Sequence, residues 1–516
     1  MKNFAFSPAI ESRAPTGVAG LDTILGGGVT QSRLYLIEGT PGAGKTTLAL
    51  QFLMEGVRRG EPGLYITLSE TEAELRAVAK THGWTLDGLE LFEIVPRDGL
   101  DPEQEQTLLH PSEVELGETV RGVMERFEAV KPKRVVLDSL SELRLLAQNP
   151  LRYRRQILAL KQFFASRDCT VLVLDGGTSE RGDLQLHSIA HGVISLHQSA
   201  TGFGAERRRL RVIKMRGIKY SGGYHDMAIL PGGVCVFPRL IAAEHAGEVA
   251  ADLLQTGLDG LDALLGGGLV PGTTTLLSGP AGVGKTTVAV RCMVSALERG
   301  DRAAFFLFDE RLPTLMLRSA ALGMDLRPHI DAKRLMIRQI DPAELCPGEF
   351  AVAVSNAVER DGAKVVVVDS LNAYLQAMPG DRHLILQMHE LLAYLSQQGV
   401  ITLMILGQHG LMGDIRTDVD LSYLADTVML LRFFEADGEV RKAISVVKTR
   451  TTDHERTIRE FCLDASGISV GAPLRAFQGI LTGVPIYRGN AGPLLTAPAT
   501  TPAHAAGELS GDAHRG

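Results

Sequence analysis

The chain has 516 residues, of which 45% are hydrophobic and 22% charged, and its formal net charge is −7. This is the composition of a globular protein, and the length allows two or more domains with separate cores. The acidic balance argues against a general nucleic-acid-binding surface. The five cysteines are scattered without Cys-x-x-Cys spacing, which disfavours a zinc site or a disulfide framework and suits a reducing compartment.

The N-terminus has no recognisable signal peptide, and no apolar run approaches the roughly 18 residues that a membrane-spanning helix needs. A cytoplasmic protein without a membrane partner is therefore expected.

The sequence contains two copies of one pattern. Residues 17–52 align without a gap with residues 257–292, and RVVLDSLSEL (134–143) corresponds to VVVVDSLNAY (365–374). The spacing between these landmarks drifts by a few residues, as loop insertions produce between copies of one fold. The tail is rich in Ala, Pro, Thr and Gly and cannot form a core. The predicted parts are an N-terminal arm (1–13), a first domain (14–240), a linker (241–255), a second domain (256–486) and a disordered tail (487–516).

In the first copy, strand patterns alternate with helical ones. The strands have no polar alternation and so indicate burial on both faces; they are RLYLIEG (33–39), GLYITLS (63–69), KRVVLDS (133–139) and CTVLVLDG (169–176). Helical spacing occurs in residues 46–60 and 151–167, and residues 206–237 alternate and turn at glycines, as hairpins do. Each domain is therefore predicted to be α/β, with a mainly parallel sheet flanked by helices and an antiparallel hairpin extension.

Each copy carries a loop of the form Gly-x-x-x-x-Gly-Lys-Thr between a strand and a helix. Such a loop directs backbone N–H groups and the positive end of the helix at phosphates. The alternative, a chance match or an inactive loop, is disfavoured because the same context occurs twice. Two ATP sites are predicted, formed by Gly39, Thr40, Pro41, Gly42, Ala43, Gly44, Lys45, Thr46 and Thr47 in the first copy and by Gly279, Pro280, Ala281, Gly282, Val283, Gly284, Lys285, Thr286 and Thr287 in the second.

ATP sites of this kind use Mg²⁺ as a second cofactor. The loop threonine and an aspartate at the end of a neighbouring buried strand supply its oxygen ligands. The candidates are Thr46 with Asp138 and Thr286 with Asp369. Capping of the following helix is the alternative role for the two aspartates.

A carboxylate that orients water or a hydroxyl is the further requirement for phosphoryl transfer. The strand after each loop helix ends in YITLSET or FFLFDER. Glu70 is the candidate in the first copy, and Asp309 with Glu310 in the second. These acids have the same alternative, capping of the next helix.

The doubled GLD-x-(I/L)-LGGG lead-in, both loops and two Lys-x-Arg elements together resemble the KaiC family of cyanobacterial clock ATPases and autokinases. The resemblance covers about residues 14–485 and is strongest in residues 417–461, which look like the family's phosphorylation segment and its continuation. It implies tandem RecA-like P-loop NTPase domains, a double-ring homohexamer, and ATP bound between subunits. The cations that would reach the neighbouring subunit's phosphates are Lys214, Arg216, Lys448 and Arg450; a solvated face is the alternative.

In this family the first domain is mainly an ATPase and the second also phosphorylates its own chain. The resemblance implies Ser422 as the acceptor, with Tyr423 beside it where the family has a threonine, so modification of Tyr423 stays open. The family's first catalytic glutamate is replaced by Ser69 and Asp309. Asp309 is one methylene shorter than a glutamate, so it reaches less far toward the reacting hydroxyl, a loss that Glu310 could compensate. Ser69 leaves Glu70 as the one carboxylate at this position of the first copy, so first-domain hydrolysis is expected to be slow or to be supported by other groups.

The resemblance also bears on partners. After FQGILTGVP (477–485) the segment that engages KaiA in the clock proteins has no counterpart, so a KaiA-type partner is not expected. Whether a different signalling protein binds the chain stays open. Two other functions stay open. One is a RecA- or DnaB-like DNA-dependent ATPase, for which the basic stretches at 151–156 and 206–211 are the only candidate contacts. The other is a nucleotide-gated scaffold with little turnover.

Overall fold

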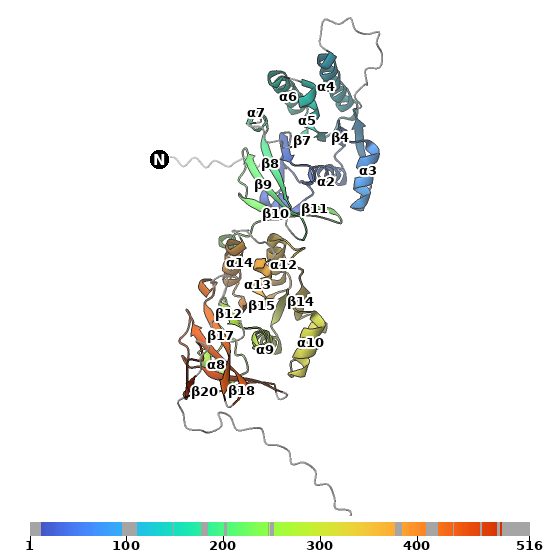
Figure 1. Ribbon diagram of the computed structural model, residues 1–516. Helices are drawn as coiled ribbons and strands as arrows, with labels where there is room; N and C mark the ends of the chain where they lie inside the picture. The colour runs from blue at the N-terminus through green and yellow to red at the C-terminus, as the bar shows by residue number, and fades with distance from the viewer. Residues whose placement is uncertain are drawn as a thin grey trace, which may run out of the picture. The chain divides into compact units, whose positions relative to one another are not determined.

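The computed structural model describes residues 12–94, 111–147, 149–176, 184–200, 204–245, 247, 252–376, 384–408, 422–436, 438–464, 467–481 and 486–487. Within these ranges the chain forms two compact units, each built on a nine-stranded sheet (Figure 1). None of the helices in these ranges is long and apolar enough to cross a membrane. The predicted arm and tail lie almost wholly outside the described residues.

Nine strands form the first sheet. In their order across it they are β11 (Gly233–Phe237), β10 (Tyr224–Leu230), β9 (Arg207–Met215), β8 (Gly192–Ser199), β3 (Leu34–Gly39), β7 (Thr170–Asp175), β6 (Arg134–Asp138), β4 (Gly63–Thr67) and β5 (Leu89–Glu93). The strands from β8 to β5 pair in parallel, and β8, β9, β10 and β11 pair antiparallel. The predicted parallel sheet with a hairpin extension is therefore confirmed for the first copy.

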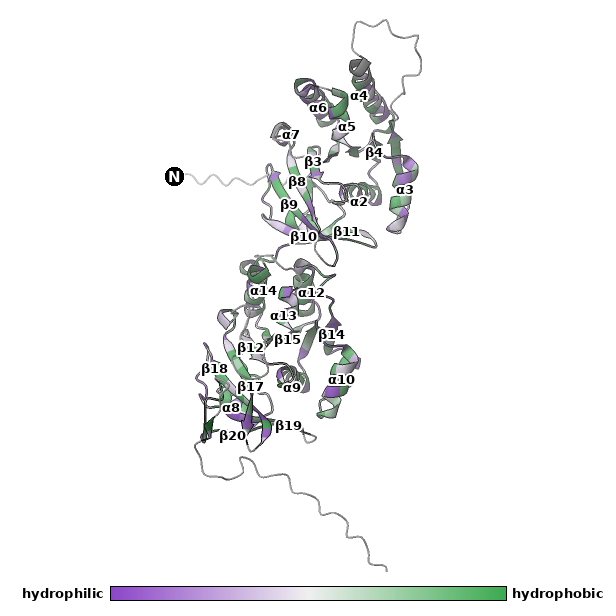
Figure 2. Ribbon diagram, in the orientation of Figure 1, coloured by the Kyte–Doolittle hydropathy of each residue, from purple (hydrophilic) through white to green (hydrophobic). Residues whose placement is uncertain are grey.

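Helices cover both faces of this sheet. They are α1 (Ala19–Ile24), α2 (Lys45–Arg58), α3 (Glu72–Thr81), α4 (Pro111–Val130), α5 (Leu140–Ala147), α6 (Pro150–Ala165) and α7 (Leu184–Ile189). Successive strand residues point to opposite faces, so Tyr35 and Ile37 pack in the core beneath α2, whereas Leu34 and Leu36 pack with α4, α5 and α6. Figure 2 shows α3 in alternating hydrophilic and hydrophobic colours, as expected of a helix with one buried face.

The second sheet repeats the first strand for strand. Its order is β20 (Gly467–Pro473), β19 (Arg459–Asp464), β18 (Glu439–Lys448), β17 (Thr427–Ala436), β12 (Thr274–Gly279), β16 (Ile401–Gly407), β15 (Ala363–Asp369), β13 (Arg302–Leu307) and β14 (Leu335–Gln339). In chain order, the helices of the second copy are α8 (Asp259–Leu264), α9 (Lys285–Glu298), α10 (Leu312–Ala321), α11 (Arg327–Asp331), α12 (Pro347–Glu359), α13 (Leu371–Gln376) and α14 (Leu384–Gln397). Two tandem RecA-like domains are the fold of the described chain.

Short elements complete the structure. The lead-in to the first sheet pairs β1 (Arg13–Ala14) with β2 (Val29–Thr30), and β21 (Phe477–Gln478) pairs with β22 (Ile486–Tyr487) near the end of the described chain. The part of the chain that the structure describes also contains two 3-10 turns, η2 (Ala242–Glu244) and η3 (Ser422–Leu424).

The aspartate of the repeated Gly-Leu-Asp pattern in each lead-in has a structural role. Asp22 Oδ1 accepts hydrogen bonds from the backbone N–H and the hydroxyl of Thr16, at 2.7 and 2.8 Å. In the second copy, Asp262 Oδ1 accepts from the N–H of Thr256 at 2.8 Å. Each aspartate thereby holds the chain that enters its domain against the short helix that follows.

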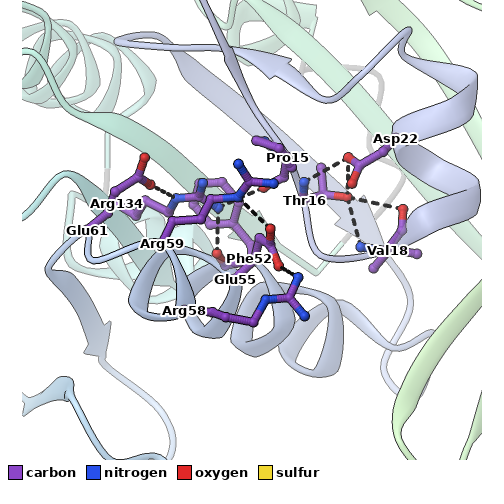
Figure 3. Close-up of polar contacts among 10 residues, drawn as sticks. All are labelled: Pro15, Thr16, Val18, Asp22, Phe52, Glu55, Arg58, Arg59, Glu61 and Arg134. Carbon is purple, nitrogen blue, oxygen red and sulfur yellow. Dashed lines mark hydrogen bonds and ion pairs between the residues drawn. The ribbon is translucent and has the colours of Figure 1, made fainter.

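A buried arginine ties the first lead-in to the core (Figure 3). The Arg134 side chain is only 1% exposed, and its Nε donates to Glu61 Oε2 at 2.5 Å. Its Nη1 donates to the carbonyl oxygens of Pro15 and Phe52, at 2.7 and 2.9 Å. The guanidinium carbon lies 4.7 Å from the centre of the Phe52 ring. One side chain therefore links β6, α2 and the segment before α1.

The second copy lacks this arrangement. Val365 occupies the position on β15 that Arg134 occupies on β6, and it is buried among apolar residues. There the lead-in is held from α9 instead, because Arg291 Nε donates to the Thr256 carbonyl oxygen at 2.9 Å. The two copies thus fasten the same segment with cations from different elements.

Replacement of Arg134 by Met is expected to lower the free energy of unfolding of the first domain by about 3 kcal/mol, because three buried or half-buried acceptors lose their donor. The single tryptophan, Trp84, packs against the core of this domain, so its fluorescence during urea unfolding reports the change. The control is Arg76→Ala, which removes an exposed ion pair with Glu72 and should cost about 0.5 kcal/mol or less. Equal losses for the two variants would contradict the assigned role of Arg134.

Candidate nucleotide-binding sites

Each glycine-rich loop connects the central strand of its sheet to a long helix. The first loop runs from the end of β3 to the start of α2, and the second from the end of β12 to the start of α9. The N-cap residues are Gly44 and Gly284, with left-handed φ angles of 99° and 113° that suit glycine. Neither helix has a side-chain cap, so its first N–H groups are available for an anion.

The loop lysines lie over their own loops. Lys45 Nζ donates to two loop carbonyl oxygens at 2.7 and 3.0 Å, and Lys285 Nζ donates to the two equivalent oxygens at 2.9 and 2.8 Å. Burial lowers the pKa of both ammonium groups, whereas the charges of Asp138 and Asp369, respectively, raise it. Each cation is therefore held where the phosphates of a nucleotide in the loop would lie.

The threonine and aspartate predicted to bind Mg²⁺ meet in both copies. Thr46 Oγ1 donates to Asp138 Oδ2 at 3.3 Å, and Thr286 Oγ1 donates to Asp369 Oδ2 at 2.7 Å. Burial raises the pKa of Asp138 and raises that of Asp369 to about 6. A hydroxyl and a carboxylate beside a phosphate loop are the oxygen ligands that Mg²⁺ takes, so the residues present fit this ion.

The two carboxylates of the second copy have different partners. Asp309 Oδ2 accepts a hydrogen bond from Ser370 Oγ at 2.5 Å, and Ser370 directly follows Asp369. Glu310 Oε2 instead forms an ion pair with Arg318 of α10, at 2.9 Å. Asp309 is thereby linked to the candidate metal ligand, while Glu310 is held by the helix that follows.

In the first copy Glu70 is preceded by Ser69, so the carboxylate pair of the second copy is a single carboxylate here. Its Oε2 is buried and has no hydrogen-bond partner among the described residues. Burial raises the pKa of Glu70, and the negative charge of Asp138 adds to that effect. An unpartnered buried acceptor near Asp138 and Lys45 is suited to accept a hydrogen bond from water.

Sequence reasoning missed three residues that contact these groups. They are Tyr65, whose hydroxyl donates to Asp138 Oδ2, and Ser370 and Arg318 of the second copy. The sequence signal for Tyr65 was a phenol hydroxyl within a mainly apolar strand. Burial raises the pKa of this phenol well above its usual value, so the hydroxyl stays a donor.

The Lys-x-Arg elements bind carbonyl oxygens of their own chain. In the first copy Lys214 Nζ donates to the carbonyl oxygens of His187 and, at 2.8 Å, Ala190, and Arg216 Nη2 donates to that of Ser188 at 2.9 Å. These acceptors lie at the end of α7 and in the turn before β8.

The second copy repeats these contacts at the predicted phosphoacceptor. Lys448 Nζ donates to the carbonyl oxygens of Ser422 and Ala425, at 2.7 and 2.8 Å. Arg450 Nη2 donates to that of Tyr423 at 3.1 Å. Ser422 is half-buried and the Tyr423 side chain is exposed. Residues 417–421 of the phosphorylation segment lie outside the described residues.

Comparison with known proteins identifies the family. A family model for the KaiC ATPase matches residues 14–241 and 254–475, one match for each copy. The chain belongs to the KaiC ATPase family. Among similar proteins, circadian clock protein KaiC3 of Synechocystis sp. is 26% identical over 92% of this chain and 94% of its own length. KaiC2 of the same organism is 27% identical over 91% of this chain and 83% of its own length.

A circadian clock oscillator protein, KaiC of Synechococcus elongatus, is 25% identical over 91% of both chains. This KaiC-family chain therefore matches these relatives along most of their length, and the expected resemblance is confirmed. The matches favour neither the DNA-dependent ATPase nor the scaffold. The two basic stretches lie on α6 and β9.

Two nucleotides should bind per KaiC-family chain, one at each loop. Lys45→Ala and Lys285→Ala should each remove one of them, because the loop loses the cation that pairs with the outer phosphates. Equilibrium dialysis with labelled ATP measures the stoichiometry. A single bound nucleotide in the unaltered chain would show that one loop is inactive.

Proposed function

We propose that this chain is a Mg²⁺-dependent ATPase that assembles as a double-ring homohexamer and phosphorylates Ser422 in its second domain. The observation that supports this most strongly is the set of lysine, threonine and aspartate that occurs with the same contacts at both loops. Membership of the KaiC ATPase family adds support for ATP as the nucleotide.

The loop residues bind the phosphates of ATP and stabilise their negative charge. When bound, Mg²⁺ supplies positive charge that offsets the charge of the transferring phosphate. Thr46 with Asp138, and Thr286 with Asp369, would hold it. Lys45 and Lys285 bind the outer phosphates, and the N–H groups that follow Gly44 and Gly284 bind the others.

The nearby carboxylates act as bases. In the first domain Glu70 accepts a proton from the attacking water through its buried oxygen. In the second domain the Asp309–Glu310 pair serves water or the acceptor hydroxyl; Ser370 orients Asp309, and Arg318 restrains Glu310. Because Ser69 carries no carboxylate, we expect the first domain to turn over ATP slowly.

The acceptor turn is held by cations. Ser422 begins η3, which precedes β17, the strand paired in parallel with the loop strand β12. Lys448 and Arg450 bind backbone oxygens of this turn and so position the Ser422 hydroxyl. The exposed Arg450 would also reach a phosphate of the neighbouring subunit, where its positive charge stabilises the transfer.

Lys285→Ala should abolish labelling of Ser422 by γ-labelled ATP, because the second loop no longer binds the transferring phosphate. Phosphosite mapping by mass spectrometry reads the result. Ser422→Ala should lose the same label while it keeps two bound nucleotides, and Tyr423→Phe should keep the label. Persistence of label on Ser422 in Lys285→Ala would disprove transfer from the second site.

Contribution of Arg450 across a subunit boundary can be tested by mixing. Neither Lys285→Ala nor Arg450→Ala alone should label Ser422. A one-to-one mixture after subunit exchange should regain labelling, because about one interface in four combines an intact loop with an intact arginine in a ring of identical contacts.

The matched control mixes Lys285→Ala with the double variant Lys285→Ala/Arg450→Ala, in which no interface is complete and no label should return. Light scattering with nucleotide present follows ring assembly in parallel. A chain that stays monomeric and still labels Ser422 at the full rate would exclude the shared site.

A further inference from the structure

The candidate metal ligand of the first domain has a second hydrogen-bond donor. The Tyr65 hydroxyl donates to Asp138 Oδ2 at 2.5 Å, and Thr46 Oγ1 reaches the same oxygen at 3.3 Å. The shorter contact therefore comes from the sheet and not from the phosphate loop. Tyr65 is fully buried, so water does not compete for its hydroxyl.

The register of the sheet produces this contact. Tyr65 of β4 lies opposite Val136 of β6, and Thr67 lies opposite Asp138. Since side chains two residues apart share a face, Tyr65 and Asp138 are diagonal neighbours on the face covered by α2. The hydroxyl at the end of the long tyrosine ring spans this diagonal.

In the second domain no phenol among the described residues donates to the corresponding aspartate, Asp369. Phe305 of β13 lies opposite Val367 of β15, which is the register of Tyr65, and it has no hydroxyl. There the loop threonine is the close donor, with Thr286 Oγ1 at 2.7 Å from Asp369 Oδ2. The shortest hydrogen bond to Asp138 thus comes from a strand of the sheet, and the short hydrogen bond to Asp369 comes from the phosphate loop.

We propose that Tyr65 is a positioning residue for the Mg²⁺ site of the first domain, because its hydroxyl fixes the orientation of the Asp138 carboxylate. The inference rests on the proposed function, in which Asp138 helps to hold the ion. A short hydrogen bond from a buried hydroxyl to a carboxylate is among the stronger kinds. Partners of this type orient metal ligands, and their loss commonly weakens metal affinity by about 10–100-fold.

The experiment uses the full chain with Lys285→Ala, so that only the first loop binds nucleotide. The affinity for a fluorescent ATP analogue is measured once in the presence of Mg²⁺ and once in the presence of EDTA. The ratio of the two affinities reports the contribution of the metal. Tyr65→Phe, which removes only the hydroxyl, should lower this ratio about tenfold or more and leave the affinity in EDTA unchanged.

Tyr35→Phe is the matched control. Tyr35 is equally buried in the same core, but its hydroxyl donates to the Thr30 carbonyl oxygen at 2.8 Å, so this variant should keep the ratio. An unchanged ratio in Tyr65→Phe, or an equal loss of affinity with Mg²⁺ and with EDTA, would overturn the positioning role. A parent chain that binds no nucleotide in either condition would overturn the proposed function, and this inference with it.

Discussion

Parallel pairing of the central strands is the constraint on which both sites depend. Parallel strands all end at one edge of their sheet, so the loop after β3, the aspartate that ends β6 and the acid after β4 come together although they are far apart in sequence. The second sheet has the same order and brings its own loop, aspartate and acids to the corresponding edge. Helices on both faces bury these strands and keep the edge in place.

The duplicated framework has diverged in the residues around this edge. The first domain carries Tyr65 and a single carboxylate, Glu70. The second carries Phe305 and a carboxylate pair whose members are held by Ser370 and Arg318. None of these differences alters the strand order. The two copies therefore keep one scaffold, while the groups that surround their candidate metal ligands differ in number and in hydrogen-bond partner.

The fold was largely predictable, and the site was predictable in part. Loops, strands and helices recur twice with their spacing, and buried strands of an α/β domain have a distinctive apolar pattern. The strands β5 and β14 were not anticipated, because each is a short strand at the parallel edge of its sheet in which only the first residue is fully buried.

Contacts between distant positions were the part that the sequence could not supply. A tyrosine within an apolar strand is interpreted as a core residue, and only the register between β4 and β6 places its hydroxyl beside Asp138. In the same way, the sequence around Arg318 predicts only a helix. The turn before α10 places Glu310 beside Arg318, and the sequence pattern does not predict this contact. The roles of the loop residues, the catalytic acids and the Lys-x-Arg elements stay predictions, as do the domain limits.

The buried guanidinium of Arg134 determines where the first domain can be truncated. Its acceptors include the Pro15 carbonyl, which lies well before the strand that enters the phosphate loop. A fragment that begins at β3 would lack the Pro15 carbonyl and would therefore leave the charged Arg134 guanidinium buried without one of its acceptors. The peptide ahead of α1 is thus an integral part of the first ATPase module, and any excised version of that module has to retain it.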